Sequence, residues 1–130
     1  MISDKLRQQL IDAAARVRQY AHAPYSNFLV GASLLTESDS LFGGCNIENA
    51  SYGLTICAER IAIGNAISHG QKNFKAICIV ADNAVSPCGA CRQFIREFGS
   101  ETIIILVDSS DNQIRKEFTI DQLLPESFSL

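Results

Sequence analysis

Three cysteines and one glutamate are the residues in this sequence whose types and spacing best suit chemistry. Cys57 opens the segment Cys-Ala-Glu-Arg, and Cys88 and Cys91 form a Pro-Cys-x-x-Cys motif later in the chain. Zinc bound by three protein ligands keeps its fourth position for water, whereas a structural zinc site is closed by four ligands. A glutamate that does not bind the metal can carry protons for that water. We therefore expect these cysteines to bind one zinc ion and Glu59 to be the proton carrier.

Both cysteine motifs are expected where the chain enters a helix. Free backbone N–H groups and the helix dipole favour the thiolate form at such a position. Three thiolates around a divalent cation carry a net charge of about -1, which opposes ionisation of a bound water. Arg60 and Arg92 each directly follow a motif residue and are candidates to offset this charge. We favour Arg60, because a guanidinium can donate hydrogen bonds to sulfur.

Two other interpretations of the cysteines remain open at this stage. A closed zinc site needs a fourth cysteine or histidine, but neither His22 nor His69 is near the motifs in sequence. A Cys-x-x-Cys pair can also be a redox-active dithiol. The third cysteine with its nearby glutamate favours catalytic zinc over both alternatives.

Two further cysteines lie outside the motifs. Cys78 falls in an apolar run and is expected to be a buried hydrophobe, and packing is also the expected role of Cys45.

Hydrophobic periodicity predicts the elements that must position these residues. Ser3 is a candidate helix cap, and the apolar run at 102–107 is typical of a strand buried on both faces. Glycines at 31, 43 and 44 indicate bulges or close backbone approach within a hairpin. The order of elements predicts a three-layer α/β/α sandwich with a mixed β-sheet. We expect helices at 3–22, 57–67, 88–99 and 121–124, and strands at 28–36, 41–47, 75–81, 102–107 and 114–118.

Length and composition predict a single domain over 1–130. The chain is 47% hydrophobic and 19% charged, which is ordinary for a globular protein. Its net charge is -3 and no basic cluster is present, so we expect no nucleic-acid partner. No apolar run has the length of a membrane span, and no signal-peptide pattern follows Met1. We therefore expect no membrane partner and a cytoplasmic location.

These motifs resemble the small, homotetrameric class of zinc-dependent cytidine deaminases. Zinc on three cysteines, a non-ligand glutamate and Pro-Cys-x-x-Cys are established marks of nucleobase deaminases. The resemblance implies hydrolytic deamination of cytidine and deoxycytidine to uridine and deoxyuridine with release of ammonia, a step of pyrimidine salvage. It covers nearly the whole chain, including the segments 25–28, 30–32, 44–53 and 124–128.

The resemblance also implies roles that spacing alone leaves unassigned. Glu59 would take a proton from the water, pass it to N3 of the base and later help the amino group to leave. Phe28 would pack against the pyrimidine ring, and Asn46 and Glu48 would hydrogen-bond the ribose. Backbone groups would hold the polar edge of the base, at Ala58 and Ser86.

The same resemblance implies that the active site is shared between subunits. Ala50, Tyr52 and Phe128 would act in the pocket of a neighbouring subunit, so a homotetramer is expected, with one zinc ion in each subunit. The partner in the reaction would be a small nucleoside.

Three other functions are weighed beside this one. One alternative is a related enzyme that acts on another amino-pyrimidine, such as the nucleoside antibiotic blasticidin S, but Glu48 favours an unmodified ribose. An editor of polynucleotides needs a basic surface that this acidic chain lacks. A non-enzymatic module stabilised by zinc would lose its fold without metal and would be inert towards nucleosides.

Overall fold

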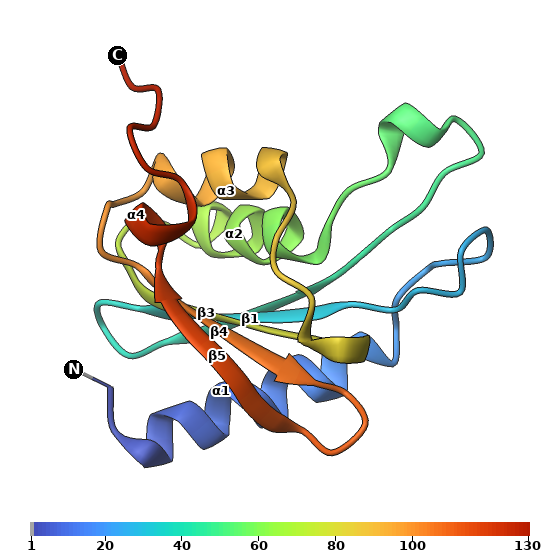
Figure 1. The fold of residues 1–130 in the computed structure, drawn as a ribbon, viewed down its shortest axis with the longest axis horizontal. Coiled ribbons are helices and arrows are strands. Elements are labelled where there is room, and N and C mark those ends of the chain that lie inside the picture. The colour runs from blue at the N-terminus through green and yellow to red at the C-terminus, as the bar shows by residue number, and fades with distance from the viewer. Residues whose placement is uncertain (1) are drawn as a thin grey trace.

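A five-stranded sheet with the strand order β2-β1-β3-β4-β5 forms the centre of the fold (Figure 1). β1 pairs antiparallel with both β2 and β3, β3 and β4 run parallel, and β5 is antiparallel to β4. The sheet is therefore mixed, as predicted. The computed structural model describes residues 2–130. Its strands are β1 (Gly31–Thr36), β2 (Leu41–Cys45), β3 (Phe74–Ala81), β4 (Ile103–Asp108) and β5 (Gln113–Thr119).

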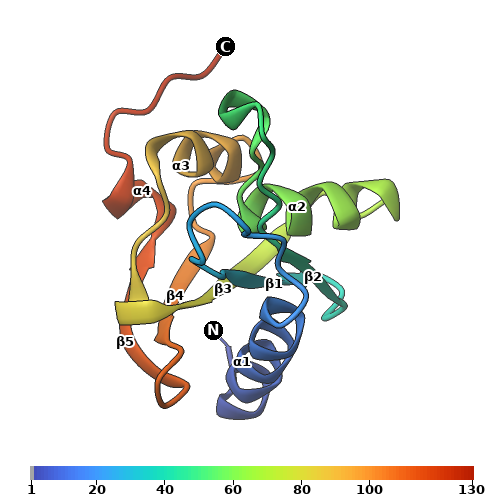
Figure 2. The ribbon, with the colours of Figure 1, turned by 90° about the vertical axis from the view of Figure 1, so that its right-hand side faces the viewer.

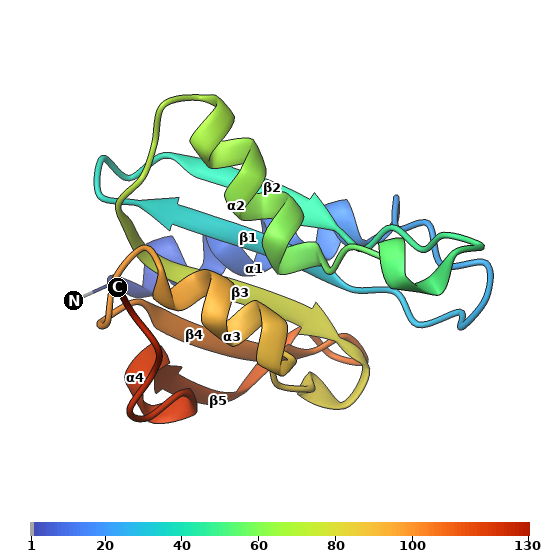
Figure 3. The same ribbon diagram turned by 90° about the horizontal axis from the view of Figure 1, so that it is seen from above.

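Helices cover both faces of this sheet and make the three predicted layers. Figure 2 shows α1 on one face, with α2 and α3 on the other. Seen from above, α2 lies over β1 and β2, and α3 lies over the β3 and β4 side (Figure 3). Among residues 2–130, none of the helices has the length and apolar character needed to span a bilayer. The helices are α1 (Asp4–Arg18), α2 (Ala58–Ser68), α3 (Gly89–Arg96) and α4 (Ile120–Leu123), with short 3-10 turns η1 (Tyr52–Leu54) and η2 (Asp82–Ala84).

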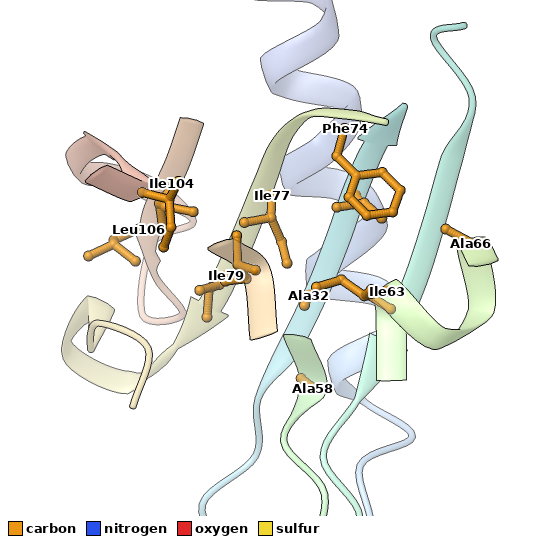
Figure 4. Close-up of a cluster of buried hydrophobic side chains, with 13 residues drawn as sticks. Ala32, Ala58, Ile63, Ala66, Phe74, Ile77, Ile79, Ile104 and Leu106 are labelled. Atoms are coloured by element: carbon orange, nitrogen blue, oxygen red, sulfur yellow. The ribbon is translucent and has the colours of Figure 1, made fainter. Parts of the chain in front are cut away.

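Strand β3 divides the core into two clusters, because successive side chains of a strand point to opposite faces. Ile77 and Ile79 face α2 and α3, where they belong to the cluster drawn in Figure 4. Cys78 and Val80 face α1 and pack in the second cluster. Both faces of the strand are thus apolar, as in other central strands. Cys78 is fully buried, which confirms that it packs as a small hydrophobe.

The first helix begins as predicted but ends early. The backbone N–H of Leu6 donates to the Ser3 hydroxyl at 3.1 Å, so Ser3 is the expected cap. The helix ends at Arg18, whereas the predicted end near His22 is wrong. A contact with a distant part of the chain explains the difference. The N–H of His22 donates to the Asn46 carbonyl at 3.0 Å, so this segment lies alongside residues 46–48 and does not continue the helix.

Close backbone contacts place α2 against the hairpin. A Cβ at Gly44 would lie 2.4 Å from the Ala62 nitrogen, so only glycine allows α2 to lie so close to β2. This confirms the predicted close approach at Gly44, and Gly31 meets α1 in the same way. The same prediction is wrong for Gly43, where a Cβ would have only ordinary contacts at 3.7 Å. Because α2 begins at the metal-binding motif, its contact with Gly44 helps to position the site.

The first strand is shorter than predicted. It begins at Gly31, because residues 28–30 are held by a side chain in place of a regular ladder. The Asn46 amide oxygen accepts from the Val30 N–H at 2.9 Å, and its nitrogen donates to the Phe28 carbonyl at 2.8 Å. Residues 28–30 therefore form an irregular segment beside the start of the sheet.

Candidate active site

The N-terminal ends of α2 and α3 bring the three cysteines of the two motifs together. Cys57 is the N-cap of α2, Cys88 is the N-cap of α3, and Cys91 lies in the first turn of α3. Their sulfur atoms all lie within 4.8 Å of one another, and the sulfurs of Cys57 and Cys88 are 3.9 Å apart. Zinc with tetrahedral thiolate ligands at its usual bond length separates two sulfurs by about 3.8 Å. The donor set and its spacing therefore fit a zinc ion.

The electrostatic surroundings of these sulfurs favour a thiolate at Cys57. A hydrogen bond from the Cys91 thiol, and a second one from Arg60, lower the pKa of Cys57 to about 5. The same hydrogen bond, together with burial, raises the pKa of Cys91. Nη2 of Arg60 lies 3.6 Å from the Cys57 sulfur. Arg60 is thus in contact with the sulfur cluster.

The second candidate arginine has a different position. Nε of Arg92 donates to the Pro87 carbonyl at 2.8 Å, and Nη1 donates to the Leu123 carbonyl at 2.7 Å. Its Nη2 also donates to the Ser86 hydroxyl at 3.0 Å. Arg92 therefore ties the loop before α3 to the C-terminal segment, and its hydrogen bonds go to these oxygens.

Glu59 is buried at the start of α2, next to the sulfur cluster. Only 5% of its surface is exposed, so it is not a solvated glutamate of a helix surface. Burial raises the pKa of its carboxyl, and the neighbouring Cys57 thiolate adds to this effect. A carboxyl whose pKa is raised is a stronger base and can take up a proton and release it again. The position suits the predicted proton carrier, and that role stays a prediction.

A cavity of about 210 Å³ opens beside these groups. Cys57, Cys88 and Glu59 line it, so the sulfur cluster and the carboxyl face the same space. Sequence reasoning identified Phe28, Asn46, Ala58 and Ser86 in its lining. It assigned no site role to Val30, Thr55, Ile79 and Val85, whose apolar or small side chains carry no recognisable chemical signal.

A second cavity of about 290 Å³ adjoins the first, and Thr55 lines both. Glu48 lies in the second cavity, with Tyr25, Ser26 and Tyr52. A larger cavity of about 490 Å³ lies at the other end of the sheet, where β3 and β4 begin. It contains none of the predicted site residues. We place the site at the sulfur cluster, because ligands of open α/β sheets bind beyond the carboxyl ends of strands.

Glu48 also has a structural contact that the sequence did not reveal. Its carboxylate accepts from the backbone N–H groups of Tyr25 at 2.9 Å and of Ser26 at 3.2 Å. The Ser26 hydroxyl donates to the same carboxylate and lowers its pKa. Like Asn46, this side chain replaces missing backbone partners of an irregular segment.

Besides Glu48, three of the predicted substrate-binding residues lie outside the cavity beside the sulfur cluster. Tyr52 is 73% exposed and contacts the ring of Tyr25 edge-on, and Phe128 is 70% exposed on the C-terminal tail. Ala50 is exposed on the loop before η1. The η1 loop and the C-terminal tail lie at opposite ends of the molecule (Figures 1 and 3). One chain alone does not bring Ala50, Tyr52 and Phe128 together.

Comparisons with known proteins point in one direction. Residues 4–107 match the family model described as the cytidine and deoxycytidylate deaminase zinc-binding region. The chain is 48% identical over 125 residues to a probable cytidine deaminase of Dictyostelium discoideum, covering 94% of this chain and 83% of that protein. It is 45% identical over 124 residues to a cytidine deaminase of Sporosarcina psychrophila, covering 94% and 90% respectively.

Solved structures agree with the predicted fold. The crystal structure of a cytidine deaminase from Burkholderia pseudomallei superposes with a TM-score of 0.88 at 41% identity, over 98% of this chain and all 100% of that one. A cytidine deaminase from Mycobacterium tuberculosis gives a TM-score of 0.84 at 35% identity, over 99% of this chain and 100% of that one. The prediction of a three-layer sandwich with a mixed sheet is therefore confirmed.

Proposed function

Since this chain belongs to the family of zinc-binding cytidine and deoxycytidylate deaminases, we propose that it hydrolyses cytidine and deoxycytidine to uridine and deoxyuridine. The observation that carries this proposal is the cavity lined by Cys57, Cys88 and the buried carboxyl of Glu59, with Cys91 in the same sulfur cluster. Phe28 adds an aromatic side chain to the same lining, which suits a flat pyrimidine. The reaction consumes one water and releases one ammonia for each nucleoside.

The three cysteines supply the metal ligands in this proposal. Cys57, Cys88 and Cys91 would hold zinc, with Arg60 offsetting part of the thiolate charge. Zinc held there lowers the pKa of a water molecule and so makes it a nucleophile at neutral pH.

Glu59 moves the protons of the reaction. Its carboxylate takes a proton from the attacking water and delivers it to N3 of the base as the oxygen adds to C4. It then takes the remaining proton from the new C4 hydroxyl and gives it to the amino group, so that the C4–N bond breaks, ammonia leaves and C4 becomes the carbonyl of uridine. Burial raises the pKa of the Glu59 carboxyl, which makes the carboxylate a stronger base towards the water.

Residues on several elements hold the nucleoside. Phe28 packs against the ring, and backbone groups of Ala58 and Ser86 bind its polar edge. Asn46 uses one amide N–H to hold Phe28, so its second N–H is left for a ribose hydroxyl. Glu48 lies in the adjoining cavity, and its carboxylate has lone pairs beyond the bonds to residues 25 and 26.

In this proposal the exposed aromatic residues make contacts between the subunits of a homotetramer. Tyr52 and Phe128 are large aromatic side chains that are 73% and 70% exposed in the single chain, so both are accessible to a neighbouring subunit. They and Ala50 would complete the pockets of neighbouring subunits in a homotetramer, each subunit with one zinc ion. The substrate would be a free nucleoside, with no nucleic-acid or membrane partner, in cytoplasmic pyrimidine salvage.

Sharing of the pocket can be tested by mixing two defective variants. Glu59→Ala and Phe128→Ala subunits would each have low activity alone. After unfolding and refolding together, mixed oligomers would contain some pockets with both native residues, so activity should return. A mixture no more active than its components, or a monomer in sedimentation, would contradict shared sites.

The reaction itself is tested by the ultraviolet absorbance of cytidine on mixing with zinc-loaded protein. We expect the absorbance to change to that of uridine while ammonia is released in equal amount. A protein that ignores cytidine and deaminates blasticidin S would belong to a different substrate class. A zinc-loaded protein that is inert towards every nucleoside, and unfolds when zinc is removed, would be a structural module.

A further inference from the structure

Arg18 joins two segments that line the cavity, although it belongs to the helix on the other face of the sheet. It is the last residue of α1, which lies opposite α2 and α3 in Figure 2. Its Nε donates to the Leu29 carbonyl at 2.8 Å, and its Nη2 lies 3.2 Å from Oδ1 of Asp82. One guanidinium group thus holds a backbone carbonyl and a carboxylate from two separate loops.

The first of these contacts reaches the wall formed by residues 28–30. Leu29 lies between Phe28 and Val30, and the side chains of both line the cavity. This segment lies outside β1, so its backbone lacks a regular ladder. Asn46 binds the Phe28 carbonyl and the Val30 N–H, while Arg18 binds the carbonyl between them. The segment is therefore held by two side chains, one following β2 and one ending α1.

The second contact reaches the start of the loop that leads to Ser86. Asp82 is followed by Asn83 at φ 62° and Ala84 at φ 49°, both in the left-handed region. For alanine this backbone conformation is unfavourable and persists only where the surroundings hold it. The carboxylate of Asp82 is held by Arg18 and also accepts from the Ser109 hydroxyl. The chain then continues through Val85 and Ser86, which line the cavity.

We propose that Arg18 is a positioning residue for the deaminase reaction, because it fixes the spacing between the Phe28 and Ser86 sides of the base site. This inference rests on the proposed function. A guanidinium suits the task, since its rigid planar fork presents different N–H groups to two acceptors at once. A lysine ammonium is a point charge on a flexible stem and cannot reproduce that fork.

The inference predicts a specific kinetic signature. Arg18 binds the two segments that contact the base, whereas Cys57 and Glu59 are placed by α2. Loss of Arg18 should therefore weaken binding of the base more than it slows proton transfer. Such a change raises KM and leaves kcat nearly constant.

Arg7 provides a matched control on the same helix. Its side chain is 24% exposed, against 25% for Arg18. It also binds one backbone carbonyl, of Ile2 at 2.7 Å, and one carboxylate, of Glu117 at 3.0 Å. None of these residues lines the proposed site. Replacement of Arg7 thus removes the same kinds of contact without touching the site.

The experiment compares steady-state kinetics for cytidine in zinc-loaded Arg18→Met and Arg7→Met variants. We expect Arg18→Met to raise KM by about fivefold to tenfold, the effect of losing one or two hydrogen bonds. Its kcat should stay within about twofold of the native value, and its zinc content should be unchanged. Arg7→Met should match the native protein, and Arg18→Lys should give an intermediate KM.

A thermodynamic cycle with Asp82 separates positioning from general weakening of the fold. Asp82→Ala should raise KM, and the double variant with Arg18→Met should raise KM by less than the product of the two single effects, because both changes break one linkage. Asp82→Asn keeps an oxygen acceptor and should be nearly native. If Arg18→Met does not fold, the KM values of Arg18→Lys, Asp82→Ala and Asp82→Asn test the same inference.

The outcomes separate two kinds of failure. Native protein without cytidine deaminase activity would refute the proposed function. With active native protein, an unchanged KM in Arg18→Met would overturn the role of Arg18. Equal changes in KM for Arg18→Met and Arg7→Met would overturn the role of Arg18 as well. So would a double variant in which the effects of Arg18→Met and Asp82→Ala on the free energy derived from KM are additive.

Discussion

Cys57 and Cys78 have the same side chain and opposite chemical properties. Cys57 lies at the N-terminus of α2 with Arg60 beside it, and its pKa is lowered to about 5 by hydrogen bonds from the Cys91 thiol and Arg60. Cys78 lies in the middle of β3 with no exposed surface, and burial raises its pKa to about 12. The contrast shows that neighbouring helix ends and donors make a cysteine suitable for metal binding, while a strand interior makes it an inert packing group.

The largest expected effect comes from removing one sulfur at the helix ends. Cys91→Ala should lose most of the bound zinc and at least about a thousandfold in kcat/KM, because the remaining two sulfurs cannot hold the metal tightly. The matched variant Cys78→Ala should keep one zinc ion per chain. Zinc content by elemental analysis and cytidine turnover measure both effects. Equal loss of zinc from Cys91→Ala and Cys78→Ala would contradict the assignment of metal binding to the cysteines at the helix ends.

Removal of the neighbouring cation should have an intermediate effect. Arg60→Met leaves the three sulfurs in place but removes the positive charge near Cys57. We expect kcat to fall by about tenfold to a hundredfold, because the more negative cluster opposes ionisation of the water. Zinc content should change little. Native kinetics for Arg60→Met would show that the charge is offset elsewhere.

Chemical labelling gives a further test of the contrast. In folded, zinc-loaded protein Cys78 should resist alkylation by iodoacetamide at pH 8, since the reaction needs a thiolate and the pKa of Cys78 is about 12. In denaturant its pKa returns towards the ordinary value, so labelling at the same pH should become fast. Mass spectrometry of the peptide containing Cys78 reads out both states. Fast labelling of Cys78 in folded protein would contradict its burial.

The smallest effect concerns stability alone. Cys78→Ala leaves a small void between β3 and α1, in the cluster that also contains Leu10. We expect a loss of about 1–2 kcal/mol in the free energy of unfolding, measured with denaturant. KM and kcat should stay at native values, because Cys78 packs in the cluster on the α1 side and does not line the cavity.

Local patterns predicted much of the fold and the central part of the site. The apolar alternation around β3 and the cap at Ser3 depend on neighbouring residues, so they are visible in the sequence. The spacing of Cys88 and Cys91 is likewise a property of one helix turn. The meeting of these residues with Cys57 was an inference from chemistry, because it depends on how α2 and α3 pack on the sheet.

The errors arose where tertiary contacts replace regular hydrogen bonding. The end of α1 and the start of β1 were misplaced, because Asn46 binds backbone groups of residues 22, 28 and 30. The hydrophobic periodicity of the sequence does not reveal a hydrogen bond between residues so far apart in the chain. The roles of Asn46 and Glu48 as backbone partners, and the position of Arg18 behind two loops, likewise depend on residues distant in sequence. Tyr52 and Phe128 lie on the surface of the single chain, and their action in a neighbouring subunit stays a prediction.

The most direct test of the central claim compares native and Glu59→Ala protein, both loaded with zinc, in cytidine turnover. Glu59 is buried beside the sulfur cluster but is not one of its three thiols. We predict that Glu59→Ala binds one zinc ion per chain, as the native protein does, and has no measurable turnover. Substantial turnover by Glu59→Ala with full zinc content would contradict its role as proton carrier and the mechanism derived from it.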